Sequence, residues 1–344
     1  MITSIHYKNF KALQDATLSL GRFTLIVGAN GTGKSSALKA LNKIDYIKNK
    51  NLNDFLTKGL DIENKQIQIE IFFKEFIFRR TISKNDITNH LLDKSFNNLG
   101  GTSGGAFTDS LISTYGKKYE GEAIKGFRIF SFDSEKIASP VPIQAGTILE
   151  ESGRGLAGIL DQLRDSEPER FEELNKELNR WFYEYDRILF EVPADGQKSF
   201  LLRTTVGKHK IKASELSDGT LLALAYLTIA YLPNPPKIVA FEEPEKGIHP
   251  RLLRNIQEAM YRLAYPENFG EKREPIQVIA TTHSPYLLDL FKDNPEEIVI
   301  ASKDEKGVHF ERLMDKPHIE EILQDAPLGE IWYSGVLGGV PAHI

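Results

Sequence analysis

The stretch from Gly28 to Ser35 constrains this chain more than any other part of the sequence. It reads Gly-Ala-Asn-Gly-Thr-Gly-Lys-Ser and matches the phosphate-binding loop pattern G-x-x-x-x-G-K-[ST] at each fixed position. Glycine lets the backbone approach a polyphosphate closely, so that the N–H groups of the loop can point at phosphate oxygens. The pattern therefore predicts a site for a nucleotide.

The segments on either side of this loop have the composition that the motif requires. Residues 23–27 form an apolar, β-branched run typical of a buried strand, and residues 36–41 are good helix formers. In this order, the positive end of the helix faces the phosphates. We predict that Lys34 contacts the β- and γ-phosphates of ATP and that Ser35 binds Mg²⁺. The expected nucleotide-binding residues are Asn30, Gly31, Thr32, Gly33, Lys34, Ser35 and Ser36.

The composition excludes several classes of protein. Of 344 residues, 41% are hydrophobic and 26% are charged, which is typical of a globular chain with one large or two modest domains. No apolar run reaches the length of a membrane span, and residues 1–5 enter a strand pattern at once, so we expect no membrane segment and no signal peptide. The absence of cysteine excludes disulfides and zinc–thiolate sites and favours a cytoplasmic location. The net charge of −5 argues against a uniformly basic surface for nucleic acid, although a local basic strip stays open.

The first third of the chain predicts mostly strands. Residues 1–20 predict two short strands around a turn, and residues 66–73 alternate polar and apolar side chains as a half-buried strand does. We expect residues 75–83 to pair with that strand as a hairpin. Residues 84–126 look least structured, and the glycine-rich run at 100–105 predicts a flexible loop.

The middle of the chain combines helices with further strands. Residues 127–132 predict a strand, and residues 153–185 follow a helical period interrupted at Pro168, which predicts a short helical insertion. Three more strands are expected at residues 187–192, 199–206 and 208–213.

The second half of the chain carries the remaining motifs. Residues 217–219 open a predicted helix over 221–231, and residues 237–241 predict an apolar strand that ends in Glu242 and Glu243. Adjacent carboxylates on a strand point to opposite faces. We therefore expect Glu242 to hold the Mg²⁺ shell, while Glu243 leaves the strand and polarises the attacking water.

The segments that follow predict a helix, a strand and a histidine turn. A helix is expected over residues 250–263 and a strand over 275–282, which leads into His283. Residues 298–300 and 308–310 predict late edge strands.

In this order the motifs resemble those of the ABC-type ATPases. The phosphate loop is followed by Leu-Ser-Asp-Gly at 216–219, by Glu-Glu-Pro-Glu at 242–245 and by Thr-Thr-His-Ser-Pro at 281–285. The chain is similar to the non-transporter branch of this class, namely RecF, the SMC-like proteins and the OLD ATPases, over residues 1–40 and 213–300. The run at 328–335 also resembles small stand-alone members, some of which are encoded beside a nuclease in antiphage defence systems.

The resemblance implies the fold class and the division of the chain. We expect an α/β P-loop NTPase fold of the ABC-ATPase type, with a β-rich lobe and a short helical insertion. The expected parts are an N-terminal core segment at 1–83, a flexible insertion at 84–126, a helical insertion with strands at 127–213, and a C-terminal core segment at 214–344.

The resemblance also implies roles for residues of the second half. Ser217, Asp218 and Gly219 match the signature motif, which contacts the γ-phosphate held by a second copy, so two ATP molecules would be held in a head-to-tail homodimer. Ser217 suits this role because a helix begins there, although a simple helix cap is also expected. His283 matches the switch histidine that senses the γ-phosphate, and it joins Glu243 as a catalytic residue. Glu245, Lys246 and Gly247 match the D-loop.

The sequence departs from the pattern of that family at three points. Glu242 stands where most members have aspartate; one extra methylene can still reach a metal-bound water, but it leaves the rate of hydrolysis open. Asp218 replaces a common glycine or glutamine of the signature. The glutamine of the Q-loop has no secure counterpart; Gln144 is the candidate, with an ordinary surface glutamine as the alternative.

These features favour an ATP-driven switch that controls a separately encoded effector, such as a TOPRIM-type nuclease, in antiphage defence. About forty residues follow the last predicted strand, too few for a TOPRIM domain of usual size, so Asp289, Asp293 and Asp304 are expected to be surface carboxylates. The alternative is a RecF- or SMC-like ATPase that acts directly on DNA in repair or chromosome maintenance. Lysines at 208, 210 and 212 or at 117, 118 and 125 could then contribute a basic groove.

Two further readings are weighed against these. The long first half and the run at 243–250 argue against the engine of a membrane transporter. A scaffold that binds ATP without hydrolysing it stays open because of Glu242.

Overall fold

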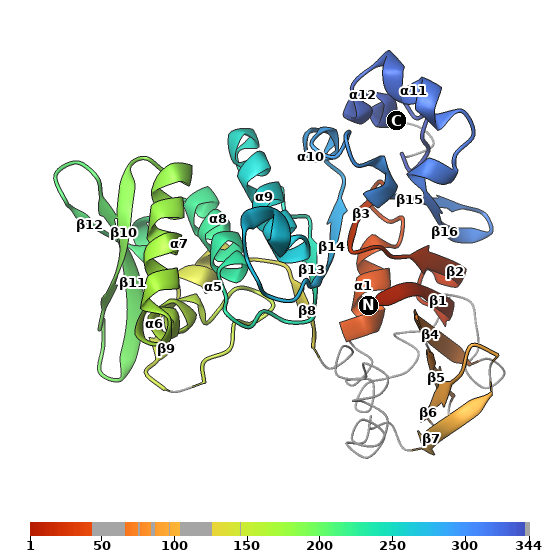
Figure 1. The fold of residues 1–344 in the computed structure, drawn as a ribbon, viewed down its shortest axis with the longest axis horizontal. Helices are drawn as coiled ribbons and strands as arrows, with labels where there is room; N and C mark the ends of the chain where they lie inside the picture. Colours follow the sequence, from red (N-terminus) through yellow and green to blue (C-terminus); the bar gives the residue numbers. More distant parts are fainter. Residues whose placement is uncertain are drawn as a thin grey trace. The chain divides into compact units, whose positions relative to one another are not determined.

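The computed structural model describes residues 1–42, 66–74, 76–83, 87–95, 97–103, 126–144 and 146–340. The chain forms two compact units. Unit 1 comprises Met1–Ile129, Pro236–Glu242 and Gln277–Ile344, and unit 2 comprises Phe130–Pro235 and Glu243–Ile276. In Figure 1, unit 1 carries the red and the blue ends of the colour scale, so both ends of the chain build it.

The first sheet of unit 1 is antiparallel. It has the strand order β2-β1-β4-β5-β6-β7, and the strands around the turn and the predicted hairpin are confirmed. The strands are β1 (Ile2–Phe10), β2 (Leu13–Ser19), β4 (Ile67–Phe73), β5 (Ile77–Ile82), β6 (Ile87–Leu92) and β7 (Asn98–Ser103).

The prediction of a flexible stretch from residue 84 was wrong for its first part, because β6 and β7 lie there. β6 pairs with β5 along its whole length, from Ile77 opposite Leu92 to Ile82 opposite Ile87. A free strand edge offers a row of backbone partners, and this pairing outweighs the weak strand propensity of the glycines in β7. The rest of that stretch, residues 104–125 with their three lysines, lies outside the described residues.

The second sheet of unit 1 has a parallel centre. Its order is β16-β15-β3-β14-β13-β8, and β15, β3, β14 and β13 run parallel while β16 pairs antiparallel with β15. The strands are β3 (Phe23–Val27), β8 (Phe127–Phe130), β13 (Ile238–Glu242), β14 (Gln277–Thr282), β15 (Ile298–Asp304) and β16 (Gly307–Arg312). All residues of β3 and β14 are buried, as expected for parallel strands covered on both faces.

The sequence predicted that 298–300 would be an edge strand, which was wrong. β15 lies between β16 and β3, so only β16 occupies that edge. The alternation of β16 is weak, with two buried residues followed by exposed and half-buried ones, which fits an edge position.

The hydrophobic core of unit 1 joins the two sheets through α1 (Lys34–Asn42). Ala37 and Leu38 of this helix are fully buried in one cluster with Tyr7 of β1 and Ile279 of β14. The Tyr7 hydroxyl donates a hydrogen bond to the backbone oxygen of Ala37 at 3.2 Å, and burial raises the pKa of this phenol. The helix that follows the phosphate loop is therefore held from the side of the antiparallel sheet.

Gln277 at the start of β14 ties the two sheets together. Its amide nitrogen donates to the backbone oxygens of Ile2 and Gly21, each at 2.7 Å, and its amide oxygen accepts from the nitrogen of Ile2 at 2.9 Å. The side chain is 1% exposed. One buried amide thus satisfies three backbone groups in segments that are far apart in the sequence.

Short helices lie in the described C-terminal part of unit 1. α10 (Pro285–Asp289) follows β14, and α12 (Leu328–Tyr333) packs against it. The same part also contains α11 (Ile319–Asp325) and the 3₁₀ turns η7 (Pro295–Glu297) and η8 (Leu313–Asp315).

Unit 2 is mostly helical and contains a small sheet of order β10-β11-β12, with β9 paired to β11. The predicted helices and strands of residues 153–213 are confirmed. The elements are α5 (Ser134–Ala138), β9 (Val141–Pro142), α6 (Leu156–Ser166), α7 (Pro168–Trp181), β10 (Tyr185–Glu191), β11 (Gln197–Thr204), β12 (Lys210–Lys212), η4 (Ala213–Glu215), α8 (Asp218–Ala230), η5 (Pro250–Leu252), α9 (Leu253–Ala264) and η6 (Pro266–Phe269).

α8 is the centre of unit 2. Every residue from Thr220 to Ala230 is buried, and α5, α7 and α9 pack against the helix. A helix that is apolar on all sides is stable only when other elements surround it. Its first turn, by contrast, begins at an exposed serine and aspartate, so the N-terminus of a buried helix reaches the surface.

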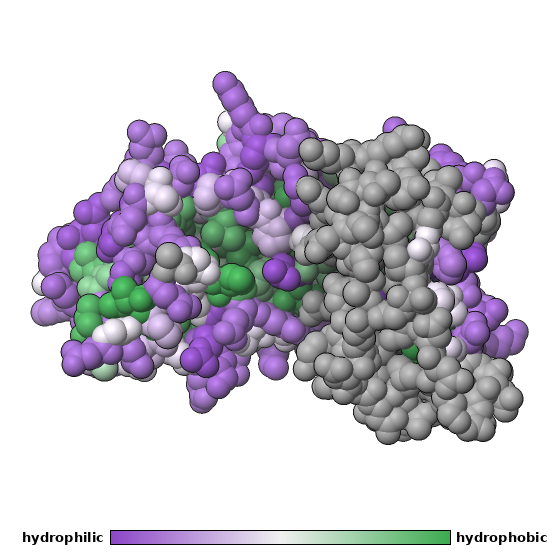
Figure 2. Space-filling model, turned by 90° about the horizontal axis from the view of Figure 1, so that it is seen from below, coloured by the Kyte–Doolittle hydropathy of each residue, from purple (hydrophilic) through white to green (hydrophobic). Residues whose placement is uncertain are grey.

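The surface of unit 2 is mixed. Figure 2 shows hydrophobic areas between hydrophilic ones on this unit. Tyr183 and Val206 are the most exposed large hydrophobic side chains, at 83% and 84%. In the part of the chain that the structure describes, no helix is long and apolar enough to cross a membrane.

We expect Gln277→Leu to lower the free energy of unfolding of unit 1 by about 2–4 kcal/mol, because it leaves buried backbone groups without partners. Urea unfolding followed by circular dichroism measures the change. The control is Gln197→Leu, at an exposed position of β11, which should change stability by less than about 0.5 kcal/mol. Equal effects of the two substitutions would contradict the role given to Gln277.

Candidate functional site

The parallel strands of unit 1 bring the predicted motifs to one edge of the sheet. Glu242 lies opposite Thr281, and Thr282 lies opposite Val27. Because parallel strands end at the same edge, the phosphate loop after β3, Glu242 at the end of β13 and His283 after β14 are neighbours there. In open α/β sheets, ligands bind outside the carboxyl ends of the strands.

The phosphate loop is closed on itself by its lysine. Nζ of Lys34 donates hydrogen bonds to the backbone oxygens of Gly28 and Ala29, at 2.5 and 2.9 Å. The side chain is 5% exposed. The hydroxyl of Thr32 donates to the oxygen of Ala29 at 2.9 Å, which tightens the same turn. The ammonium group thus lies inside the loop, where a phosphate would need a positive charge.

The other loop residues are arranged for access from solvent. Asn30, Gly31 and Ser35 are exposed, and Gly33 and Ser36 are half-buried. Gly31 and Gly33 have positive φ angles of 84° and 86°, which only glycine adopts without strain. α1 begins at Lys34, so its free N–H groups and the positive end of its dipole face the loop.

The outer side of the loop is packed against the C-terminal part of unit 1. A Cβ atom at Gly28 would lie 2.4 Å from the backbone oxygen of Ala301 in β15, so no larger residue fits. The nitrogen of Gly28 donates to the oxygen of Thr282 at 3.3 Å, and the nitrogen of Ala29 donates to the oxygen of Gly339 at 2.5 Å. The loop therefore rests on segments from the end of the chain.

Glu242 lies close to Lys39 of α1. Its Oε2 atom is 3.6 Å from Nζ of Lys39, and its side chain is 10% exposed. The second oxygen, Oε1, is buried and has no hydrogen-bond partner among the residues that the structure describes. A buried carboxylate oxygen without a partner is costly. The donor set of Ser35 and Glu242 fits a magnesium ion, which binds through one or two protein oxygens together with phosphates and waters.

His283 is exposed at the end of β14 and is followed by a helix start. The hydroxyl of Thr282 accepts a hydrogen bond from the nitrogen of Ser284 at 2.9 Å, and Ser284 caps α10. Asp289 at the other end of α10 accepts from the nitrogen of Gly329 in α12 at 2.6 Å. A Cβ atom at Gly329 would lie 2.5 Å from the oxygen of Pro285, so the two helices touch through their backbones.

The predicted signature residues lie in unit 2, at the N-terminus of α8. The hydroxyl of Ser217 accepts from the nitrogen of Thr220 at 3.2 Å, so the helix-cap interpretation is confirmed. Ser217 and Asp218 are exposed and Gly219 is half-buried. A Cβ atom at Gly219 would lie 3.3 Å from the oxygen of Gly247, which brings the signature and the predicted D-loop together.

Glu243 and the predicted D-loop form a tight turn in unit 2. Glu243 has a φ angle of +47°, a conformation that costs a non-glycine residue about 1–2 kcal/mol. Its oxygen accepts from the nitrogen of Lys246 at 2.9 Å. The hydroxyl of Tyr226 has a raised pKa because of burial and, secondarily, the carboxylate of Glu245. Lys246 and Gly247 are exposed on the same turn.

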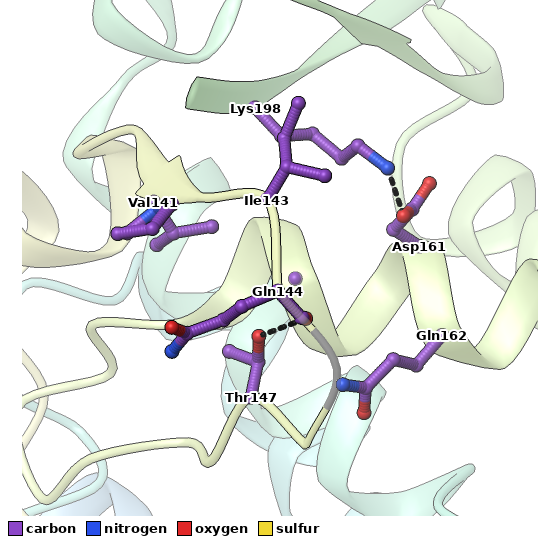
Figure 3. A pocket seen from close by; sticks show the side chains of 9 residues that line it. Val141, Ile143, Gln144, Thr147, Asp161, Gln162 and Lys198 are labelled. Carbon is purple, nitrogen blue, oxygen red and sulfur yellow. Dashed lines mark hydrogen bonds and ion pairs between the residues drawn. The ribbon is translucent and has the colours of Figure 1, made fainter. Parts of the chain in front are cut away.

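Gln144, the Q-loop candidate, is an exposed residue of unit 2. It lines a pocket of about 240 Å³ between α6 and the segment after β9. Figure 3 shows Lys198 and Asp161 facing each other at one wall and Thr147 bonded to the backbone oxygen of Gln144. No residue of the phosphate loop lines this pocket, so the Q-loop assignment stays a prediction.

The carboxylates considered as nuclease ligands do not gather. Asp293 and Asp304 are exposed, and Asp289 is half-buried and bonded to α12 as described above. A hydrogen bond from His309 keeps the pKa of Asp304 below its usual range. Among the described residues, no group of three or more His, Cys, Asp and Glu side chains could hold a metal ion.

A model of a known protein family matches most of the chain, from residue 23 to residue 289. The family is described as "AAA domain, putative AbiEii toxin, Type IV TA system". The chain belongs to this family. The match covers the phosphate loop, Glu242 and His283 in unit 1 and the predicted signature residues in unit 2. The predicted α/β P-loop NTPase fold is therefore confirmed.

Two further comparisons give proteins to which this chain is similar. The chain is 23% identical to an OLD nuclease of Thermus scotoductus, over 96% of this chain and 68% of that protein. A solved structure of the recombination mediator RecF covers 90% of this chain and 98% of its own, with 10% identity and a TM-score of 0.45. The family match and the OLD relative agree with the resemblance to ABC-type ATPases of the OLD group.

Two contacts of the site were missed by the sequence reasoning. Lys39 follows Ser35 by one helical turn, and residues four apart share a helix face, so its nearness to Glu242 could have been inferred from spacing. The contact of Gly339 with the phosphate loop joins positions too far apart in the sequence for any local pattern to reveal it.

We expect Gly28→Ala to weaken nucleotide binding by at least about tenfold, because the added methyl group must push the loop away from Ala301. Fluorescence titration with a labelled ADP measures this. Gly31→Ala is the comparison, since a Cβ atom there meets nothing within 4 Å and adds only backbone strain, about 1 kcal/mol. If Gly31→Ala were the more damaging change, the packing argument would be wrong.

Proposed function

We propose that this chain is an ATP-hydrolysing switch whose two copies close head-to-tail around two ATP–Mg²⁺ and control a separate effector in antiphage defence. Lys34 and the loop residues Asn30 to Ser36 bind the phosphates. Ser35 and Glu242 hold the metal, Glu243 polarises the attacking water, and His283 senses the γ-phosphate. The family to which the chain belongs supports ATPase chemistry.

The observation that carries the proposal is the buried Oε1 atom of Glu242, which has no partner among the described residues and lies at the sheet edge where the phosphate loop follows β3. Such an oxygen is stabilised by a cation, and Ser35 one turn before Lys39 supplies a second ligand. When bound, Mg²⁺ would neutralise charge that develops on the phosphate oxygens. The protein's own contribution is to orient the phosphates with the loop amides and Lys34.

The conformation of Glu243 supports its catalytic role. Residues held in rarely populated backbone regions cluster at active sites, where the strain is part of the function. The positive φ angle of Glu243 breaks the strand immediately after Glu242. Two adjacent glutamates can therefore serve different purposes, one as a metal ligand and one as the base.

The exposed start of α8 supports a role in trans. Its N-terminal amides and helix dipole form an anion-binding surface, and Ser217 adds a hydroxyl. The γ-phosphate of a nucleotide held by a second copy fits this surface in charge. A two-fold symmetric pair would use two such contacts, one for each nucleotide.

The names of the relatives support an effector that damages nucleic acid. The family description names a toxin, and the Thermus scotoductus relative is named a nuclease. We propose that a nuclease of the TOPRIM type is the separate partner of this chain and that ATP-dependent closure releases or triggers it. The exposed hydrophobic side chains of unit 2 are available for contact with another protein.

The alternative is an ATPase that acts directly on DNA. Lys210 and Lys212 favour it, since both are exposed on β12 at the edge of the small sheet. Lys208 contributes less, because it forms an ion pair with Asp186. A hydrogen bond from Arg203 and, secondarily, one from Lys208 lower the pKa of Asp186 to about 2.

Glu243→Gln expressed with its native gene neighbourhood tests these proposals. We expect hydrolysis to fall by at least about a hundredfold, because the base is lost while ATP and Mg²⁺ still bind. The trapped protein should then contain two copies of the 38.8 kDa chain, or a higher even number of copies, together with a second protein that adds its own mass. Mass photometry and mass spectrometry of the purified material measure both properties.

The control is Glu305→Gln, an exposed glutamate in the turn between β15 and β16, which should leave hydrolysis and mass unchanged. A nucleotide-bound dimer without a partner but with salt-sensitive DNA affinity would favour the alternative. A monomer whose mass does not respond to ATP would contradict both.

A further inference from the structure

The ion pair between Lys39 and Glu242 in the candidate site is longer than a well-formed one. The distance of 3.6 Å between Nζ and Oε2 exceeds that of a good charge-assisted hydrogen bond. The other oxygen of Glu242 is buried and has no partner in the part of the chain that the structure describes. The lysine therefore supplies charge to the carboxylate but satisfies neither of its oxygens fully.

The two partners differ in burial. Glu242 is 10% exposed, whereas Lys39 is 37% exposed. A buried carboxylate needs a nearby cation, because removing it from water is costly. A lysine with an accessible head can move its ammonium group into solvent while its methylenes stay in place. The carboxylate of Glu242 is thus fixed in place, whereas the ammonium group of Lys39 beside it can move away into solvent.

Lys39 lies on the face of α1 that also carries Ser35, a proposed ligand of the metal. Lys39 follows Ser35 by four residues, so the two side chains lie on one face of α1. Ser35 is the hydroxyl ligand of the proposed metal site. A positive charge on that face and a divalent cation bound to Glu242 would repel each other.

We propose that Lys39 is a built-in counter-cation that neutralises Glu242 in the nucleotide-free protein and competes there with divalent metal. This inference rests on the proposed function, since it takes Glu242 as the metal ligand. Free Mg²⁺ is thereby kept off the carboxylate until the phosphates of ATP add their own negative charge. Lys39 is a positioning and selectivity residue and takes no part in bond breaking.

The glutamate at position 242 fits this role. Its side chain is one methylene longer than aspartate, and this length brings its carboxylate from the end of β13 to the side chain of α1. The carboxylate of an aspartate at this position would lie one methylene closer to the backbone of β13. Most members of the ABC-type class have aspartate at this position. The presence of Lys39 opposite Glu242 then explains why this chain has glutamate instead.

Titration of Mn²⁺, followed by the loss of its free-ion electron paramagnetic resonance signal, tests the proposal. The full chain is used without nucleotide and then with ADP. Without nucleotide, Lys39→Met should bind Mn²⁺ about fivefold more tightly than the wild type, the upper limit for a partly exposed ion pair. Lys39→Arg keeps the charge and should stay within about twofold. Lys303→Met, at an exposed position of β15, is the matched control and should not change the affinity.

Glu242→Gln separates the possible failures. If Glu242→Gln weakens Mn²⁺ binding with ADP but Lys39→Met binds Mn²⁺ no more tightly than the wild type without nucleotide, the role of Lys39 is overturned and the metal site stands. If Glu242→Gln binds Mn²⁺ with ADP as well as the wild type does, the metal site itself is wrong, and the inference fails with it. Circular dichroism of each variant confirms that the fold is intact.

Discussion

The parallel pairing of β14 with β3 on one side and β13 on the other is the constraint on which the site of unit 1 depends. It aligns the last residues of three strands whose positions in the sequence lie far apart, so that Val27, Thr282 and Glu242 end at one edge. A shift of one residue in either pairing would turn each strand's side chains to the opposite face. The full burial of β3 and β14 prevents such a shift, because it would have to move apolar side chains out of the core.

The site is equally dependent on contacts that hold this sheet to the rest of unit 1. Gln277 fixes the start of β14 to β1 of the antiparallel sheet. The hydroxyl of Tyr7 in β1 is hydrogen-bonded to the backbone oxygen of Ala37 in α1. The phosphate loop rests on Ala301 and Gly339. Both ends of the chain therefore support a loop near its beginning, and changes far from the loop in sequence can alter its shape.

Much of this arrangement could be predicted because its signals are local. The loop at 28–35, the apolar run at 237–241 and the turn at His283 each carry their own pattern, and the order of these motifs led to the family. The predictions that failed concerned elements that depend on tertiary pairing. β6 and β7 form because β5 offers a free edge, and β15 is an interior strand because β16 pairs with its outer edge. The contact of Gly339 with the phosphate loop likewise depends on how distant segments pack. No sequence pattern indicates that Glu242 belongs to unit 1 and Glu243 to unit 2.

The two lysines of the candidate nucleotide site, Lys34 and Lys39, both contact oxygen atoms of the protein itself. Lys34 is bonded to the oxygens of its own loop, and Lys39 lies beside Glu242, so each cation faces a protein oxygen. Bound phosphates would give Lys34 a stronger partner than neutral carbonyls, and a metal would give Glu242 a closer cation than Lys39. In both cases a weak contact within the protein would be replaced by a stronger contact with the ligand. The two changes are linked because the positive charge of the metal neutralises the negative charge of the phosphates. Cooperative uptake of metal and nucleotide, rather than sequential binding of either alone, is the behaviour that such an arrangement favours.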